Sequence, residues 1–346
     1  MSKIGVIGHF GIGLNLANGQ TIKTKIITDE LRKKYNNDVN IVDTHGGIKN
    51  IFKVIRNTIN LIKNCDNIII MVTENGLKTL VPVLIKFNRK YKRKLHYVVI
   101  GGWLESFLKS KGGIKNKLKK FDCIYVETTT MKKQLTNMGF SNVLIMPNCK
   151  DLNIIDKKEI EKKKIIEPVK LCTFSRVMKE KGIEDAINAV IDINNKYNKI
   201  GCSLNIYGEI DVNQTEWFNN LKKSFPKFIK YCGVAKYDKS VNILKKYDVL
   251  LFPTHFYTEG IPGTIIDAYA AGIPVISSKW ESFNDVVDDN KTGLGYNFNS
   301  FDDFKNKIDK IVNNPNLIKE LSNNCIEKAN DFKIENVMKV LYAQIV

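Results

Sequence analysis

The chain has 346 residues, of which 43% are hydrophobic and 26% charged, a balance typical of a globular protein large enough for two domains. This balance excludes a disordered or collagen-like chain, and no apolar run approaches the roughly 20 residues that cross a membrane. The formal net charge of +18 is unevenly distributed: residues 1–150 carry 26 Lys and Arg against 9 Asp and Glu, whereas residues 151–346 carry 28 against 27. The asymmetry predicts that the first half faces an anionic partner.

In the first half, short apolar runs alternate with amphipathic segments. This alternation predicts parallel strands joined by crossover helices. Strands are expected at residues 3–8, 39–43, 67–72, 95–100, 122–126 and 142–146. Helices are expected at residues 21–35, 48–64, 77–91, 114–121 and 129–138.

A charged region, residues 151–168 with its charge run at 156–164, separates this series from a second one. It shows no apolar face, so we interpret it as a solvated connector that contains the domain boundary. The second series predicts strands at residues 169–174, 203–207, 228–232, 249–253 and 274–277, and helices at 183–197, 216–225, 239–246 and 264–271. We therefore expect an α/β protein with two Rossmann-like, doubly wound domains, residues 1–160 and 161–330, facing a central cleft. A last helix within residues 331–346 is expected to pack back on the first domain.

The cysteines and histidines give no sign of a disulfide framework or a metal site. The seven cysteines include no Cys-x-x-Cys pair and mostly adjoin apolar strands, so they are expected to be buried, reduced thiols. The four histidines are scattered without metal-ligand spacing. The chain opens on a predicted strand, without an apolar segment of signal-peptide length, and we expect a cytoplasmic protein.

A glycine-rich loop, Gly8 to Gly13, follows the first predicted strand. Its spacing, Gly-x-x-Gly-x-Gly, departs from the dinucleotide fingerprint Gly-x-Gly-x-x-Gly. We interpret these glycines as letting the backbone approach a bound ligand, with a plain flexible loop as the alternative.

Two cations follow the strand at residues 169–174. The segment from Ser175 to Gly182 contains Arg176 and Lys181 and precedes a helix. Arg offers a planar fork and Lys a point charge, and both suit phosphate oxygens. The alternative is solvated surface charge.

A second loop follows the buried strand at residues 249–253. It reads Glu-Gly-Ile-Pro-Gly-Thr-Ile-Ile-Asp from Glu259 to Asp267, and we place Asp267 in the first turn of the next helix. The backbone N–H groups of Gly263 and Thr264 are expected to form an anion site at the positive end of that helix. Carboxylates on either side of an anion site would suit the sugar and the ribose of a nucleotide-sugar.

Together these residues resemble a known family. Ser175-Arg176 with Lys181-Gly182, and Glu259 to Asp267 followed by Ala-Ala-Gly-x-Pro-Val-Ile, resemble the signature of retaining glycosyltransferase family 4, as in bacterial capsular and cell-surface polysaccharide enzymes. The resemblance covers most of the second half closely and the first half in outline. It implies the GT-B fold, a nucleotide-diphosphate-sugar donor such as a UDP-sugar in the second domain, an acceptor in the first domain, and no metal ion or other cofactor.

The resemblance also implies roles for single residues. Arg176 and Lys181 would hold the donor diphosphate and Glu259 the hexose hydroxyls, and these three form the expected catalytic set. Asp267 would hold the ribose, although the family usually has the longer Glu there. The expected donor-binding residues are Gly11, Gly13, Ser175, Gly208, Gly233, Val234, Gly260, Pro262, Gly263, Thr264 and Asp267.

In one place the sequence departs from the family. Many members carry a histidine at the end of a first-domain strand near the transferring carbon, and here Ile100-Gly101-Gly102-Trp103 occupies that place. His96 lies at the start of the strand and is expected to be a packed or a surface residue. A donor-sugar preference inferred from that histidine is therefore unsupported.

Basic segments with apolar neighbours lie in the first half, at residues 51–63, 87–94 and 104–120. Such segments predict peripheral docking on an anionic membrane, here the inner face of the plasma membrane, and suit a glycan or polyprenyl-diphosphate-linked acceptor. The alternative is ordinary helices with lysines in water.

The function expected is that of a retaining glycosyltransferase. The chain contains no Asp-x-Asp triplet, the pattern that would indicate a metal-dependent sugar transferase. The alternatives are a same-fold nucleotide-sugar epimerase or phosphorylase and, from another class, a nucleic-acid-binding protein.

Overall fold

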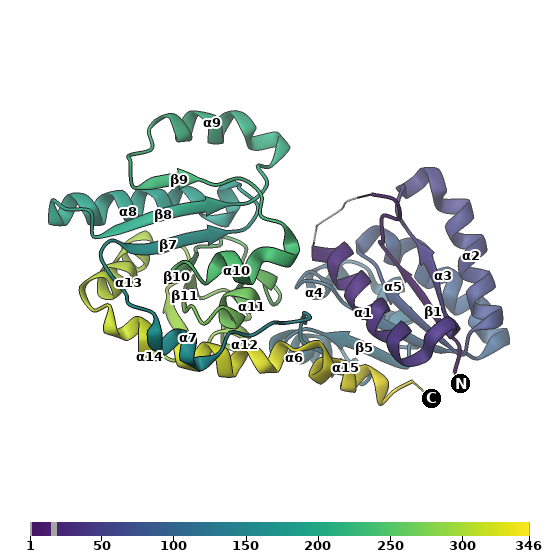
Figure 1. The fold of residues 1–346 in the computed structure, drawn as a ribbon. Helices are drawn as coiled ribbons and strands as arrows, with labels where there is room; N and C mark the ends of the chain where they lie inside the picture. Colours follow the sequence, from purple (N-terminus) through teal and green to yellow (C-terminus); the bar gives the residue numbers. More distant parts are fainter. Residues whose placement is uncertain (1, 15–18, 346) are drawn as a thin grey trace. The chain divides into compact units, whose positions relative to one another are not determined.

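Two parallel six-stranded sheets form the framework of the protein, each in its own unit of the computed structural model, which describes residues 2–14 and 19–345 (Figure 1). Unit 1 comprises Met1–Asp151 and Phe332–Val346, and unit 2 comprises Leu152–Asp331. The division falls after residue 151, at the start of the predicted boundary region 151–168, whereas the first domain was drawn to residue 160.

The sheet of unit 1 has the strand order β2-β1-β3-β4-β5-β6, and all its pairs are parallel. Every residue of β1 and β3 is buried, which explains their uninterrupted apolar runs, because a parallel strand is covered by helices on both faces. The strands are β1 (Ile4–Gly8), β2 (Val39–Asp43), β3 (Asn67–Met71), β4 (Lys94–Val98), β5 (Cys123–Val126) and β6 (Val143–Ile145).

Helices cover both faces of this sheet (Figure 1). They are α1 (Gly19–Tyr35), α2 (Ile51–Asn64), α3 (Glu74–Tyr91), α4 (Leu104–Lys109), α5 (Gly112–Leu118), α6 (Thr129–Asn137) and α15 (Ile334–Tyr342). The C-terminal α15 packs beside α1, where the Tyr342 hydroxyl donates to the carbonyl oxygen of Glu30 at 3.1 Å. The chain thus returns to unit 1 after unit 2 is complete.

The sheet of unit 2 has the order β12-β11-β10-β7-β8-β9 and is also parallel throughout. Its strands are β7 (Val169–Phe174), β8 (Cys202–Tyr207), β9 (Ile229–Tyr231), β10 (Val249–Phe252), β11 (Val275–Ser278) and β12 (Gly293–Tyr296). The sequence analysis did not predict β12, because its Gly-Leu-Gly-Tyr sequence lacks a β-branched run. A Cβ at Gly293 would lie 2.2 Å from the carbonyl oxygen of Val275, so the glycine allows β12 to approach β11.

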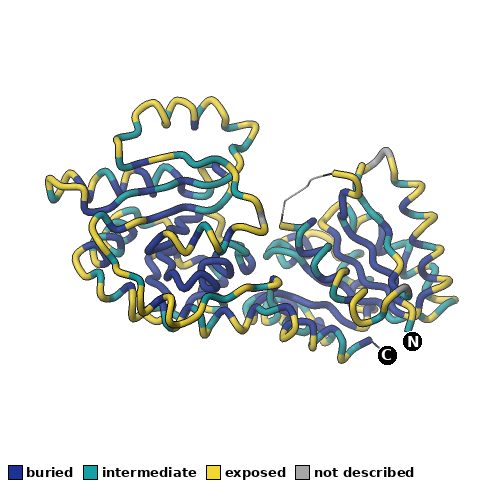
Figure 2. Tube along the Cα trace, viewed as in Figure 1, coloured by how far each residue is buried: buried dark blue, intermediate teal, exposed yellow. Residues whose placement is uncertain are grey.

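The helices of unit 2 are α7 (Lys157–Lys162), α8 (Ile183–Tyr197), α9 (Thr215–Lys223), α10 (Ser240–Leu244), α11 (Gly263–Ala270), α12 (Phe283–Val286), α13 (Phe301–Asn313) and α14 (Asn316–Ala329). The prediction that residues 156–164 form a solvated connector was wrong. The short α7 buries Ile160, whose side chain fills the space that a Cβ at Gly272 would occupy. This contact and the ion pair of Lys163 with Asp248 at 3.2 Å fix the charged segment to unit 2. Figure 2 shows how buried and exposed stretches alternate along the chain.

All seven cysteines are free; six are buried and Cys232 is half-buried. Within the described residues, no group of three or more His, Cys, Asp or Glu side chains could hold a metal ion. No helix in the same part of the chain is long and apolar enough to cross a membrane.

Candidate active site

The strand order of unit 2 reverses between β7 and β10. From β7 the chain moves outward through β8 and β9, and it then crosses back to continue through β10, β11 and β12. In open parallel sheets, ligands bind outside the carboxyl ends of the strands at such a reversal. The loops that follow β7 and β10 carry the two predicted motifs, so the topology brings both motifs to one place in the sheet.

Lys181 and Glu259 join these two loops. The ammonium of Lys181 forms an ion pair with Oε1 of Glu259, and both side chains are mostly buried, with exposed fractions of 18% and 17%. The hydroxyl of Thr254 donates to the same Oε1 at 3.2 Å, and Lys181 Nζ lies 4.8 Å from the ring centre of Phe256. The structure therefore places a fixed cation and a fixed carboxylate side by side at the edge of the sheet.

Arg176 lies on the same loop as Lys181 but is more exposed. Its side chain is 52% exposed, and its guanidinium lies 3.6 Å from Oδ2 of Asp211, on the loop that follows β8. The backbone N–H of Asp211 donates to the carbonyl oxygen of Val177 at 3.0 Å, which holds that loop beside Arg176. The sequence analysis missed Asp211, since nothing in its local sequence marks it as a partner of Arg176.

Two glycines allow the loops at this edge to approach each other through their backbones. Gly182 has φ of +66°, and a Cβ there would lie 1.9 Å from the carbonyl oxygen of Pro253. Gly208 has φ of +143°, and a Cβ there would lie 1.7 Å from the carbonyl oxygen of Ser175. Only glycine fits either position without moving a neighbouring loop.

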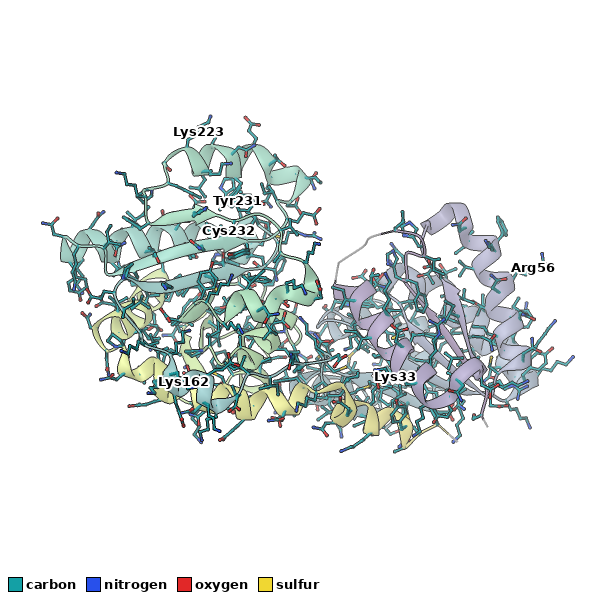
Figure 3. The ribbon with its side chains drawn as sticks, in the orientation of Figure 1. Lys33, Arg56, Lys162, Lys223, Tyr231 and Cys232 are labelled. Carbon is teal, nitrogen blue, oxygen red and sulfur yellow. The ribbon has the colours of Figure 1, made fainter. Side chains whose placement is uncertain are left out.

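The loop after β9 completes the edge beside β8. The N–H of Gly208 donates to the carbonyl oxygen of Gly233 at 2.9 Å, and the Tyr231 hydroxyl donates to the carbonyl oxygen of Gly208 at 2.8 Å. Figure 3 labels Tyr231 and Cys232 where this loop begins. Val234 follows with a side chain that is 67% exposed. The predicted residues after β7, β8 and β9 are thus linked by backbone contacts.

The start of α11 is open to an anion. Gly260 and Pro262 lie on the loop before it, and no side chain caps the helix. Among the described residues, the N–H groups of Gly263 and Thr264 have no hydrogen-bond acceptor, and the buried Oγ1 of Thr264 has no partner. Three donors at the positive end of a helix suit a phosphate.

The position predicted for Asp267 needs a correction. Because α11 begins at Gly263, Asp267 is its fifth residue and lies beyond the first turn. Its side chain is buried, with 5% of the residue exposed. The carboxylate therefore belongs to the inner part of the helix, one turn away from the free N–H groups.

In unit 1 the glycine loop follows β1, next to the reversal of strand order between β1 and β3. Gly11 and Gly13 have positive φ angles of +59° and +82°. The Asp43 carboxylate, at the end of β2, accepts the N–H groups of Phe10 and Ile12, each at 2.9 Å. Burial alone would raise the pKa of Asp43, but the hydrogen bonds from the loop hold that pKa below its ordinary value. These two N–H groups are therefore engaged by Asp43, a residue that the sequence analysis missed.

His96 is a packed residue, one of the two possibilities that the sequence left open. Its ring nitrogens lie 3.0 Å from the Tyr125 hydroxyl and 3.1 Å from Oδ1 of Asn67, inside unit 1. Burial lowers the pKa of His96 to about 4. The ring is therefore an enclosed, hydrogen-bonded residue in the interior of unit 1.

Comparisons with known proteins point to one class of enzyme. A family model described as glycosyl transferases group 1 matches residues 155–332. An uncharacterized glycosyltransferase of Methanocaldococcus jannaschii, MJ1069, is 28% identical over 317 residues, which cover 84% of this chain and 76% of the relative. The matched residues 155–332 include every predicted donor residue except Gly11 and Gly13.

Solved structures with a similar fold include one protein of Anabaena and one of Thermosynechococcus elongatus. Alr3699/HepE of Anabaena in complex with UDP-glucose has a TM-score of 0.74 at 13% identity, covering 99% of this chain and all of that one. A sucrose-phosphate synthase of Thermosynechococcus elongatus has a TM-score of 0.76 at 15% identity, covering 99% of both chains. At these identities the likeness shows the fold alone, and that fold is GT-B.

Proposed function

The chain belongs to the glycosyl transferases group 1 family and is a glycosyltransferase with the GT-B fold, and on this premise we propose that it is a retaining enzyme of family 4 that uses a UDP-sugar. The observation that carries the proposal is the union, at one edge of unit 2, of the Lys181–Glu259 pair with the uncapped start of α11. A cation and free N–H groups suit a diphosphate, and an adjacent carboxylate suits sugar hydroxyls. The choice of UDP is supported by HepE, whose structure holds UDP-glucose.

The proposed chemistry is electrostatic. Cleavage of the bond from sugar to phosphate builds negative charge on the leaving diphosphate, and fixed donors stabilise such charge without having to reorganise. Lys181, Arg176 and the N–H groups of Gly263 and Thr264 would supply them. Glu259 would orient the sugar through its hydroxyls. The acceptor hydroxyl then attacks on the face from which the phosphate leaves, and a phosphate oxygen takes its proton, so the step calls for no metal ion.

We assign the acceptor to unit 1 and place the enzyme at the inner face of the plasma membrane. Unit 1 carries 28 Lys and Arg against 11 Asp and Glu, whereas unit 2 carries 26 against 25. On α2, Phe52 is 86% exposed and is followed by the exposed cations Lys53 and Arg56, the latter labelled in Figure 3. An exposed aromatic ring among cations suits an anionic lipid surface. Seven free cysteines also suit the reducing cytoplasm.

The proposed acceptor is a glycan or a polyprenyl-diphosphate-linked sugar chain, as used in making capsular or other cell-surface polysaccharide. The diphosphate of a polyprenyl-linked acceptor matches the positive charge of unit 1, and its apolar anchor matches the proposed docking on a membrane. A same-fold epimerase or phosphorylase would share the donor site of unit 2 but would not consume such an acceptor.

A screen of nucleotide-sugars for thermal stabilisation tests the donor assignment. A donor at 100 times its dissociation constant adds about 2.7 kcal/mol to the free energy of unfolding. We expect one UDP-sugar to stabilise the chain and then to be consumed only when an acceptor is added. Consumption without any acceptor would favour the epimerase, whereas stabilisation by nucleic acid and by no nucleotide-sugar would contradict the proposal.

A further inference from the structure

His255 ties together three segments at the edge of unit 2. It lies on the loop from β10 to α11, four residues before Glu259, and its N–H donates to the carbonyl oxygen of Glu180 at 2.9 Å. Its Nε2 lies 3.0 Å from Oδ2 of Asp185, in the first turn of α8. Its Nδ1 lies 2.8 Å from Oδ1 of Asn299, on the loop between β12 and α13.

Both partners of the ring present oxygen atoms to its nitrogens. A carboxylate and an amide oxygen can only accept hydrogen bonds, so both ring nitrogens must donate, and only the imidazolium form can do so. A neutral ring could donate only one of the two hydrogen bonds. The other would form only if the amide of Asn299 rotated and donated to the ring. Burial raises the pKa of the Asp185 carboxyl, and the contact with His255 opposes that rise.

The charged groups around this contact come from each neighbouring segment. From α8 there are Asp185 and Glu184, which raises the pKa of Asp185. From β12 there is Tyr296, whose pKa Asp185 helps to raise, burial being the larger cause. The loop itself carries Glu259, which is paired with Lys181. Asp185 is therefore the only one of these groups that contacts the ring within the described residues.

We propose that protonated His255 is a positioning residue that holds the β10–α11 loop in its donor-binding form, so that affinity for the nucleoside diphosphate falls as His255 loses its proton. The inference rests on the proposed function of this site. Thr254, next to His255, contacts Glu259, and Glu180, which accepts the His255 N–H, precedes Lys181. Movement of His255 would therefore disturb both members of the Lys181–Glu259 pair.

Calorimetric titration with UDP from about pH 6 to about pH 9 tests the inference. The variants are His255→Gln, which cannot become a cation, and Asp185→Asn, which removes the negative partner and keeps an accepting oxygen. Lys199→Ala is the control, because Lys199 forms an exposed ion pair with Glu167 elsewhere in unit 2. The pH dependence of UDP itself is common to all four proteins and drops out of their affinity ratios.

We expect the native chain to bind UDP about tenfold more tightly than His255→Gln at the acid end, in line with one charge-assisted hydrogen bond. This ratio should approach one at the alkaline end. The affinity of Asp185→Asn, taken relative to that of His255→Gln, should change less with pH. The donor KM should rise in both variants with little change in kcat. A ratio that stays constant with pH would overturn the inference and leave the proposed function intact.

A second measurement keeps the two claims separate. In the native chain with ¹⁵N-labelled histidine, both ring nitrogens of His255 should show the imidazolium signal at pH 6, with His255→Gln identifying the resonance. A neutral tautomer at that pH would overturn the inference even if UDP binds. Failure of UDP and of every other nucleoside diphosphate to bind would instead overturn the proposed donor site and, with it, this inference.

Discussion

Lys181 and Glu259 form an ion pair that joins the loop after β7 to the loop after β10, across the reversal of strand order in unit 2. Each partner is more than four-fifths buried, so neither charge is well solvated. In the proposed function, the donor diphosphate and Glu259 compete for the same ammonium group. A diphosphate that takes Lys181 frees Glu259 to accept hydrogen bonds from the sugar.

Substitutions of the two carboxylates, Glu259 and Asp267, should impair the site in different ways. Replacing Glu259 by Gln leaves Lys181 uncompensated, so the affinity for UDP should be kept or increased while transfer of the sugar falls by roughly 100-fold. Replacing Asp267 by Ala should weaken the binding of UDP, because it removes the buried carboxylate that the family resemblance assigns to the ribose. Calorimetry with UDP and the rate of transfer separate the two effects. Equal losses of UDP affinity in both variants would contradict this division of roles.

The Gly208→Ala substitution should distort the donor site by displacing the backbone of a neighbouring loop. The new methyl group would lie 1.7 Å from the carbonyl oxygen of Ser175, so the loop that carries Arg176 must move. We expect weaker UDP binding and a loss of about 1–3 kcal/mol of unfolding free energy, the usual cost of such strain. The control is Gly113→Ala, since a Cβ there meets nothing within 4 Å in α5. Native UDP affinity in Gly208→Ala would contradict the placement of the site.

The free energy of unfolding should decrease as the pH is lowered, because His96 is buried as a neutral ring. Its pKa is about 4 in the folded chain and about 6.5 when unfolded, so below pH 6.5 the unfolded state binds a proton that the folded state does not. Stability is therefore lost as pH falls from about 6.5 to about 4, by roughly 2 kcal/mol at pH 5. Urea unfolding at pH 7 and pH 5, followed by the fluorescence of the three tryptophans, measures the loss. His96→Gln should show a smaller loss between the two pH values, and an unchanged loss would refute the assignment.

Unit 1 should bind anionic vesicles at low salt. The Debye length falls from about 10 Å at 0.1 M to about 3 Å at 1 M, so the higher salt should release the protein. Phe52→Ser and Arg56→Ser should each weaken binding, the latter by about 1 kcal/mol. Lys223→Ser, an exposed change on α9 of unit 2, is the control. Sedimentation with anionic and with neutral vesicles measures the bound fraction. If the protein does not bind anionic vesicles at 0.1 M salt, the membrane proposal is wrong.

Apolar periodicity predicted most of the framework because buried parallel strands and amphipathic helices leave direct marks in sequence. The bounds of β7 and α8 agree with the prediction residue for residue. Where local sequence and packing disagree, the prediction was wrong. The glycines of β12 are not typical of a strand, so the sequence did not indicate one. The lysines around Ile160 likewise gave no sign of a packed helix.

The site was predictable as far as its residues form motifs. Arg176, Lys181 and Glu259 follow strands in recognisable patterns, and the structure places them at one edge of unit 2. Their partners come from distant parts of the chain. Asp211 reaches Arg176 from the loop after β8, and Asp185 and Asn299 reach His255 from other elements. Such contacts depend on the order of strands in the sheet, which local sequence does not report.

The most direct test of the donor-diphosphate site is the rate of sugar transfer by Lys181→Ala, compared with the native chain and with Lys199→Ala. Loss of a preorganised donor to developing charge predicts a fall in kcat of roughly 100-fold or more, with native activity in the control. The same assays in EDTA should give unchanged rates, since the proposed chemistry uses side chains and N–H groups. A Lys181→Ala variant that transfers sugar at the native rate would contradict the account.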